Sequence, residues 1–346
     1  MQVRHTSPIN TTPLHDDNRT VISEPGRLRP PDIAVIGIGG AGTNAVNRMI
    51  AARVQGVRFA VLNTDTQVLA LSRAEQRIYL GRETTRGRGT GGNPMLGMKA
   101  GEESRAEIQA LLHGVDMVFI AAGMGGGTGT GVAPLVAQMA RDQGTLTVGI
   151  VTLPFHFEGS QRRAIAEQGV KRLQEEVDAL ITIPNDRLLM AMPRGISLAE
   201  SFRIADDILR QGVQGIAEVI TVPGLVNVDF ADVRSVMSEA GYTVMSLGEA
   251  SGENRAIQAA AMAAAGSWLG ASIRGAKRIL LNITGGPDLT LFEVTDIATY
   301  VAEAVDTSTD ITLGAVIDPG MTDMVRVTLI AADIPTQEGD IAARRR

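Results

Sequence analysis

Residues 120–131 restrict the fold of this chain more than any other segment. They read Ile-Ala-Ala-Gly-Met-Gly-Gly-Gly-Thr-Gly-Thr-Gly, after the mostly apolar stretch 115–119 and before the apolar segment 132–137. An apolar run, a glycine-rich loop and a second apolar run predict a strand, a turn and a helix. Because glycine has no Cβ atom, backbone N–H groups of such a turn can converge on an anion at the helix N-terminus. The segment therefore predicts a strand–loop–helix unit that binds phosphate oxygens.

Close packing of the helix against the strand is the alternative explanation for these glycines. It would account for two or three of the five glycines between 125 and 131, so the phosphate interpretation is preferred. No Gly-Lys-Ser or Gly-Lys-Thr sequence occurs in the chain, and the segment is therefore not a P-loop. The expected phosphate-binding residues are Gly125, Gly126, Gly127, Thr128, Gly129, Thr130 and Gly131.

Length and composition exclude several classes of protein. A chain of 346 residues is long enough for about two domains, and 44% hydrophobic with 20% charged residues is typical of a soluble globular protein. The absence of Cys excludes a disulfide framework and a thiolate metal site, and the four His residues are scattered along the chain. A net charge of −6 argues against a nucleic-acid partner.

The first thirty residues are rich in Thr, Pro, Asn and Arg and lack the apolar core of a signal peptide. They predict a flexible N-terminal arm over residues 1–30. Elsewhere Arg, Gly or Asp interrupts each apolar stretch before it reaches the roughly eighteen residues that a membrane span needs. We therefore expect no direct membrane span, and a cytoplasmic protein.

Short apolar runs alternate with amphipathic segments from Asp32 to about Ile183. The expected strands lie at 33–36, 59–62, 115–121, 146–151 and 179–183. Strands that alternate with helices predict a parallel sheet with helices on both faces. The first domain is therefore expected to be α/β and Rossmann-like.

A different pattern begins at Ser197. Apolar residues recur there every three or four positions without a breaker, which predicts one long helix over 197–222. Further expected elements are a short helix after Asp229, strands at 242–246, 278–283, 311–317 and 324–330, and helices near 253–265 and 291–304. The fold class is thus a parallel-sheet domain (31–222, including the long helix) joined through that helix to a smaller α+β domain (223–333), with a short tail (334–346).

A second glycine-rich turn follows the first expected strand. Residues 37–44 read Gly-Ile-Gly-Gly-Ala-Gly-Thr-Asn and match G-x-G-x-x-G, which alone would favour a dinucleotide fold. The segment 63–65 even places an acid where the ribose ligand is expected, so an NAD-dependent enzyme stays open as an alternative. Two phosphate-binding turns on one sheet favour a polyphosphate instead. The residues expected at this turn and beside it are Gly39, Gly40, Ala41 and Asn63.

A third glycine-rich loop occupies residues 87–94, between a strand that ends near Leu80 and a helix near residue 97. Gly91, Gly92 and Asn93 of this loop could close over a terminal phosphate. Without the other two loops beside it, a mobile surface loop is an equally good interpretation.

Two pairs of charged residues are further candidates. Glu158 and Arg162 would be neighbours on a helix, and although such pairs are usually surface ion pairs, their place beyond a strand end favours sugar contacts slightly. Asp229 and Asp232 suit the start of a helix on structural grounds alone. A helix N-terminus also holds carboxylates in a fixed geometry, in which they can orient water against a phosphate.

With these residues in view, the chain closely resembles the FtsZ family, bacterial tubulin homologues that polymerise at the division site. The resemblance covers roughly residues 31–333. It rests on Gly-Gly-Gly-Thr-Gly-Thr-Gly at 125–131 and on Asn227-x-Asp229-x-x-Asp232, which separates this family from Rossmann lookalikes.

The resemblance implies a GTPase of the tubulin/FtsZ fold that binds GTP or GDP, with Mg²⁺ held through the phosphates. Glu158 and Arg162 would then meet the ribose, and Phe202 would stack near the base. Further contacts to guanine or sugar are implied for Asn44, Asn185 and Asp207. Asp207 would accept from guanine N1 and N2, a donor pair that adenine lacks.

The family's site is completed in trans, so Asn227, Asp229 and Asp232 of one copy would reach the γ-phosphate of the next and catalyse hydrolysis. The implied partner is a second copy, added head to tail, together with other division proteins or a paralogous FtsZ at the cytoplasmic division site. A non-hydrolysing scaffold or regulator of another filament is the second hypothesis, against which Asp229 and Asp232 argue.

Three features depart from the family pattern. Asp206 precedes Asp207 where many relatives have Asn, and Leu153 replaces a commonly basic residue. Relatives also carry a long linker and a peptide that binds membrane adaptors, whereas this sequence ends in three arginines at 344–346. The resemblance therefore does not extend to the part of the family that binds membrane adaptors.

Overall fold

A computed structural model describes residues 30–192, 195–222, 224–226, 228–266, 273–306 and 308–334 of the chain. All elements below belong to one compact unit that begins at Pro31. Apart from Pro30 and Ile334, the predicted N-terminal arm and C-terminal tail lie outside the described residues, as does Asn227. Within the described ranges, no helix is long and apolar enough to cross a membrane.

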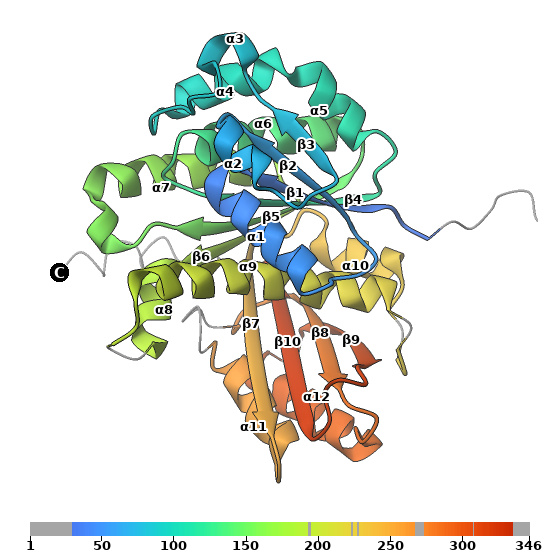
Figure 1. Ribbon diagram of the computed structural model, residues 1–346. Helices are drawn as coiled ribbons and strands as arrows, with labels where there is room; N and C mark the ends of the chain where they lie inside the picture. Colours follow the sequence, from blue (N-terminus) through green and yellow to red (C-terminus); the bar gives the residue numbers. More distant parts are fainter. Residues whose placement is uncertain are drawn as a thin grey trace, which may run out of the picture. The chain divides into compact units, whose positions relative to one another are not determined.

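The first part of the unit is a parallel sheet of six strands (Figure 1). The strands are β1 (Ile33–Ile38), β2 (Arg58–Asn63), β3 (Gln76–Tyr79), β4 (Met117–Gly123), β5 (Leu146–Leu153) and β6 (Ala179–Pro184). Their order is β3-β2-β1-β4-β5-β6, so the chain reverses its direction of travel across the sheet between β1 and β4. In doubly wound sheets, ligands bind outside the carboxyl ends of the strands at this switch point.

Helices cover both faces of this sheet, which explains why its strands read as continuous apolar runs. On one face, α1 (Gly39–Ala51), α9 (Leu198–Thr221) and α10 (Phe230–Met237) contribute to one core cluster. On the other face, a second cluster includes α4 (Pro94–Glu103), α5 (Arg105–Leu112), α6 (Thr128–Asp142) and α7 (Ser160–Gln174). Shorter helices are α2 (Thr66–Ala70), α3 (Arg82–Thr85), η1 (His156–Glu158) and α8 (Asn185–Ala191).

The second part of the unit is a mixed sheet in the order β7-β10-β8-β9. Its strands are β7 (Gly241–Ser251), β8 (Arg278–Gly285), β9 (Asp310–Ile317) and β10 (Met324–Ala332), and it packs against α11 (Arg255–Ala264) and α12 (Leu291–Ala304). β10 is antiparallel to both neighbours, and β8 is parallel to β9. The fold class expected from the sequence is confirmed.

One pairing was not expected. Ala179–Ile181 of β6 pairs in parallel with Gly241–Thr243 of β7, which joins the two sheets into one sheet of ten strands. Several strands are also longer than their apolar runs, as in β5, where Thr152 and Leu153 continue the ladder against β6. Such extensions depend on the neighbouring strand, and the apolar pattern does not reveal them.

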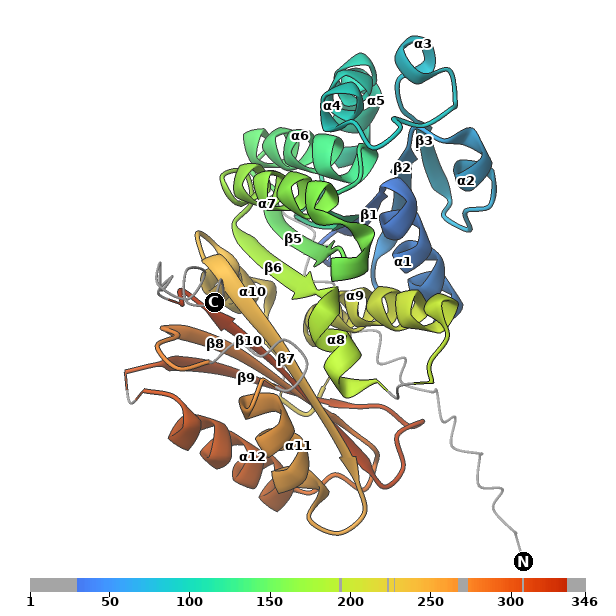
Figure 2. The ribbon, with the colours of Figure 1, turned by 90° about the vertical axis from the view of Figure 1, so that its left-hand side faces the viewer.

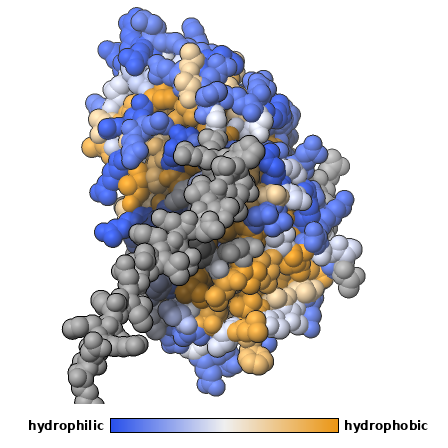
Figure 3. All heavy atoms as spheres, turned by 90° about the vertical axis from the view of Figure 1, so that its right-hand side faces the viewer, coloured by the Kyte–Doolittle hydropathy of each residue, from blue (hydrophilic) through white to orange (hydrophobic). Residues whose placement is uncertain are grey.

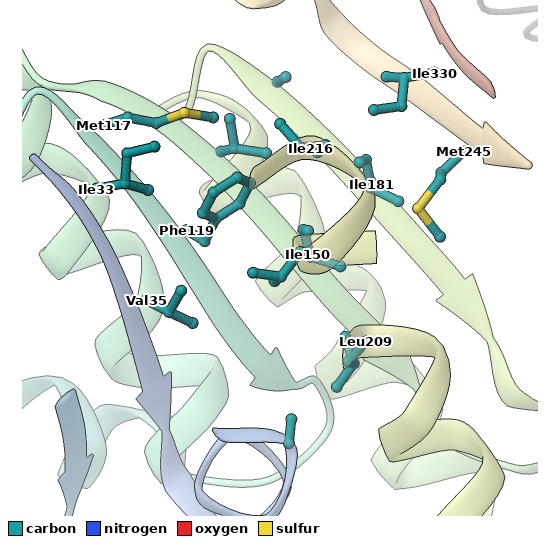
Figure 4. Close-up of a cluster of buried hydrophobic side chains, with 14 of the residues drawn as sticks. Ile33, Val35, Met117, Phe119, Ile150, Ile181, Leu209, Ile216, Met245 and Ile330 are labelled. Atoms are coloured by element: carbon teal, nitrogen blue, oxygen red, sulfur yellow. The ribbon is translucent and has the colours of Figure 1, made fainter. Parts of the chain in front are cut away.

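Helix α9 connects the two parts, as predicted. Ser197 caps it by accepting from Glu200 N at 3.2 Å, and Val222 is its C-cap, so the observed helix matches the expected range 197–222. Figure 4 shows Leu209 and Ile216 of α9 packed among side chains of the parallel strands. Met245 of β7 and Ile330 of β10 belong to the same cluster, so a single core extends from one sheet to the other.

Candidate functional site

The three glycine-rich loops meet at the carboxyl edge of the parallel sheet, at the switch point between β1 and β4. A Cβ atom built on Gly39 would lie 3.0 Å from Gly129 N, which places the 37–44 turn against the start of α6. A Cβ atom on Gly127 would overlap the hydroxyl of Thr90 in the third loop. The hydroxyls of Thr64 and Thr128 lie 2.7 Å apart and connect the end of β2 to α6. The loops therefore form one continuous surface.

Three glycines of the 125–131 run serve packing rather than ligand access. A Cβ on Gly127 would overlap Thr90, one on Gly131 would overlap the carbonyl of Pro94, and one on Gly129 would lie 2.6 Å from Gly123 O. Gly125 is needed for a backbone φ of +96°. The packing explanation thus holds for three of the five glycines, the upper end of the two or three that it was expected to cover.

Five glycines of the three loops are open. Gly40, Gly89, Gly91, Gly92 and Gly126 have no heavy atom within 4 Å of an ideal Cβ position, so nothing in the protein requires glycine there except the positive φ of Gly89, Gly91 and Gly92. They mark where a ligand can approach the backbone closely.

The helices that start at these turns have free N-terminal donors. No side chain caps α1 or α6, whereas Asp65, Asn93 and Ser197 cap α2, α4 and α9. Uncapped N–H groups and the positive end of the helix dipole favour an anion at both helix starts. Asn93 reaches the site through its backbone, because its side-chain oxygen accepts from Met95 N at 2.9 Å and Leu96 N at 3.3 Å.

Aromatic side chains lie at the other end of the site, beyond β5. The ring of Phe202, on the first turns of α9, packs edge-to-face on Phe155 with centroids 5.3 Å apart. Phe157 also stacks on Phe155, with ring centroids 5.2 Å apart. Phe155 is buried and Phe202 is partly exposed, so Phe202 offers its free face to a flat ligand.

Glu158 and Arg162 form the expected ion pair, with 3.2 Å between Arg162 Nη1 and Glu158 Oε2. The expectation of one shared helix was wrong, because Glu158 ends η1 and Arg162 lies in α7, separated by Gly159 at a φ of +100°. Glu158 also accepts from Phe155 N at 2.8 Å. The carboxylate is thus held in place by two groups.

The three predicted asparagines occupy different environments. Asn185, at the end of β6, is buried, and its side-chain oxygen has no hydrogen-bond partner among the described residues. A buried amide oxygen without a donor is costly, and a bound ligand can supply the donor. Asn44 is exposed on α1. Asn63 is buried and engaged, since it donates to Thr43 Oγ1 at 3.4 Å and accepts from Asp65 N at 3.1 Å.

Two neighbouring carboxylates on α9 differ in their surroundings. Asp206 is 8% exposed and lies 3.3 Å from Arg48 Nε of α1. Burial raises the pKa of Asp206 from 3.8 to about 6, against the opposing effect of Arg48. Burial alone would also raise the pKa of Asp207, but hydrogen bonds from Arg210 at 2.6 Å and Gln211 at 2.7 Å hold it below its usual range.

Asp206 was not among the residues expected to contact the nucleotide. It follows Phe202 by one helical turn, so both side chains lie on the same face of α9. That face is directed toward α1, which carries Asn44 one turn before Arg48. The spacing of Phe202 and Asp206 was a signal available in the sequence.

Asp229 and Asp232 form a reciprocal capping box at the start of α10. Asp232 N donates to Asp229 Oδ1 at 2.8 Å, and Asp229 N donates to Asp232 Oδ2 at 3.3 Å. Both side chains are exposed. The helix-start interpretation is confirmed, and it leaves both carboxylates accessible in a fixed orientation.

These two acids lie at the opposite end of α9 from Phe202. The helix has 24 residues and is therefore about 36 Å long. Figure 1 shows α8 and α10 on opposite sides of the molecule, and Figure 2 looks onto the side of α8. The predicted catalytic acids and the glycine loops of one molecule thus do not meet.

The described residues contain no group of three or more His, Asp or Glu side chains arranged to hold a metal ion. A divalent cation at the glycine loops would have to take most of its ligands from a bound phosphate chain and water, as Mg²⁺ commonly does.

Comparisons with known proteins agree with this geometry. Residues 32–193 match the family model described as Tubulin/FtsZ family, GTPase domain, and residues 241–335 match FtsZ family, C-terminal domain. The chain is similar to an empty FtsZ dimer from M. jannaschii at 41% identity, over 88% of this chain and 89% of that one, with a TM-score of 0.85. GDP-bound CetZ1 from Haloferax volcanii matches at 23% identity, over 90% and 99% of the chains and a TM-score of 0.78, which supports the fold alone.

Proposed function

This chain belongs to the tubulin/FtsZ family, and we propose that it binds and hydrolyses GTP while assembling head to tail into filaments. The observation that carries the proposal is the separation of its two half-sites. Open glycines at one end of α9 suit a phosphate chain, and exposed carboxylates stand at the other end. Family membership also removes the NAD-dependent enzyme from consideration.

The phosphates would lie against the open glycines of the three loops, with backbone N–H groups at the starts of α1 and α6 as donors. The expected contacts are Gly39, Gly40, Ala41, Gly91, Gly92, Asn93 and the 125–131 run. When bound to those phosphates, Mg²⁺ supplies charge neutralisation. Gly127, Gly129 and Gly131 take part through their backbone, because protein atoms fill the space beside their Cα atoms.

The base and sugar would lie toward β5, β6 and the start of α9. Phe202 offers a ring face, Glu158 and Arg162 a polar pair for the ribose, and Asn185 an unpartnered oxygen. A carboxylate there can accept from guanine N1 and N2, and adenine offers no such donor pair.

Two carboxylates are available for this contact. Asp207 is the residue expected from the family resemblance, and its side chain is 41% exposed. Asp206 shares the face of α9 with Phe202, which makes it the stronger candidate on geometric grounds.

Hydrolysis requires the second half-site, and only another copy can deliver it. In a head-to-tail contact, Asn227, Asp229 and Asp232 of one copy would face the γ-phosphate of its neighbour. The two acids would orient and polarise the attacking water, and the capping box keeps them in place. The glycine-loop N–H groups would stabilise charge that develops on the phosphate.

Exposed apolar side chains at both ends support such a contact. Leu225, which is 69% exposed, and the exposed Val226 lie just before the acids in the chain. Figure 3 shows the side of the molecule that carries α10, where hydrophobic residues gather in patches. Phe157, 60% exposed, and Leu198 lie at the nucleotide end. A contact between the nucleotide end of one copy and the acid end of the next is heterologous, and repetition of this contact produces a filament.

We propose a cytoplasmic filament at the division site, with other division proteins or a paralogous FtsZ as further partners. A non-hydrolysing scaffold is the second candidate, and the exposed, prearranged pair Asp229 and Asp232 argues against it.

Sedimentation with Mg²⁺ and GTP, GDP or ATP, combined with phosphate release over a protein concentration series, tests the proposal. We expect pelleting with GTP only, and hydrolysis per molecule that is negligible below a critical concentration. Hydrolysis per molecule that does not depend on concentration would mean a self-contained site and would refute the shared one.

A further inference from the structure

Two arginines of the third glycine-rich loop stand out among the cations at the carboxyl edge of the sheet. The side chains of Arg86 and Arg88 are exposed, and neither guanidinium has a hydrogen-bond or ion-pair partner among the described residues. Four other arginines along this edge are in ion pairs. The pairs are Arg48–Asp206, Arg162–Glu158, Arg163–Asp186 and Arg203–Glu200.

The strand order gives a bound nucleotide a direction along this edge. Candidates for base and sugar follow β5 and β6, at one end of the order β3-β2-β1-β4-β5-β6. The two phosphate turns follow β1 and β4 in the middle. The loop with Arg86 and Arg88 follows β3, at the far end. A phosphate chain that leads away from the sugar therefore has its last phosphate nearest this loop.

The loop is fixed at the phosphate turns and strained between its anchor points. Thr90 packs against Gly127, and Gly89 N donates to Thr64 O at 3.1 Å. Arg86 has a φ of +51°, which is unfavourable for a residue with a side chain, and the glycines that follow also have positive φ. Such strain persists where the surroundings impose it, and it is common at ligand-binding loops.

The negative charge of a terminal phosphate also favours cations at this loop. A terminal phosphate carries about two negative charges, and the 125–131 run contains no lysine or arginine to meet them. Guanidinium groups form strong charge-assisted hydrogen bonds with phosphate oxygens.

We propose that Arg86 and Arg88 are the side-chain cations of the γ-phosphate site and make this chain prefer GTP over GDP. This inference rests on the proposed GTP-binding function. It assigns the two residues to ground-state recognition of the terminal phosphate, and hydrolysis stays with the acids of the neighbouring copy.

The test is calorimetric titration of the full chain, below its assembly concentration and with Mg²⁺, using a slowly hydrolysed GTP analogue and GDP. Arg88→Gln and Arg86→Gln should each lower affinity for the analogue about tenfold, as expected for one charge-assisted contact. Affinity for GDP should change less than about twofold, because GDP lacks the phosphate concerned. Arg88→Lys should fall between parent and Arg88→Gln, since it keeps the charge and loses the planar fork.

Arg82→Gln is the matched control. Arg82 is an exposed arginine in the same segment, but its guanidinium packs on the Tyr79 ring at 5.6 Å. Its replacement should leave both affinities unchanged. Thermal melts of all variants should agree with the parent, because the replaced side chains are exposed.

Three outcomes would overturn the inference. Equal losses for GDP and the analogue would place the arginines elsewhere on the nucleotide. If the variants bound both nucleotides as tightly as the parent, the two arginines would be ordinary solvated side chains. If affinities were unchanged but assembly was weakened, the arginines would pair with carboxylates of the neighbouring copy instead. A parent chain that bound neither nucleotide would instead refute the proposed function.

Discussion

The two proposed half-sites, at opposite ends of α9, make a complementation experiment possible. One variant, Gly126→Val, would block the phosphate site, because the added side chain enters space where no protein atom lies within 4 Å. The other, Asp232→Asn, would remove a proposed catalytic carboxylate and keep an oxygen that accepts from Asp229 N. Each variant alone should be nearly inactive as a GTPase. Neither change should disturb the fold.

The activity of an equal mixture follows from counting contacts. A complete site needs the nucleotide end of an Asp232→Asn copy and the acid end of a Gly126→Val copy. If the two variants associate at random, each end is intact in half of the contacts, so the mixture should reach at most about one quarter of the parent's rate. A site contained in one molecule predicts a rate near zero, since every molecule then carries a defect.

Phosphate release would be measured at fixed total protein while the fraction of one variant runs from none to all. We expect a curve that is near zero at both ends and highest near equal amounts. A mixture that stays as inactive as its components, although sedimentation shows that the two variants co-assemble, would refute the trans site. Dilution with the parent, in place of the second variant, serves as the control for co-assembly.

Two further predictions concern stability. Gly127→Ala should destabilise the protein by about 1–3 kcal/mol in urea denaturation, because its Cβ would overlap the Thr90 hydroxyl. Gly126→Ala is the matched control and should lie within about 0.5 kcal/mol of the parent. Equal effects of the two substitutions would refute the division into packed and open glycines. Burial raises the pKa of Asp206 from 3.8 to about 6. Between these pH values the folded protein therefore binds more protons than the unfolded chain. As pH rises from about 4 to about 6, this group should lower the free energy of unfolding by up to about 3 kcal/mol. Denaturation of the parent and Asp206→Asn across this range should show that the variant loses this decline, and parallel curves would contradict the assignment.

The sequence predicted the local structure around the candidate site where nearby residues determine it. The two glycine-rich turns each follow an apolar strand, and strand–turn–helix units place their turns at one edge of a parallel sheet. The capping role of Asp229 and Asp232 was likewise visible, because it depends on residues three positions apart.

The sequence could not show features that depend on distant neighbours. The need for glycine at 127 and 131 comes from Thr90 and Pro94, which belong to another loop and its helix. The pairing of β6 with β7 joins segments far apart in the chain. The burial of Asp206 depends on α1, whose Arg48 lies 158 positions away. None of these contacts leaves a local pattern.

The length of α9 has a consequence for any filament that this chain builds. If every complete site lies between two copies, a row of n copies contains n − 1 such sites. The copy whose nucleotide end faces no neighbour then keeps its GTP until another copy arrives, while every interior nucleotide is open to hydrolysis. One terminus therefore holds GTP while the copies behind it convert to GDP. Each addition of a copy starts hydrolysis at the site that it completes.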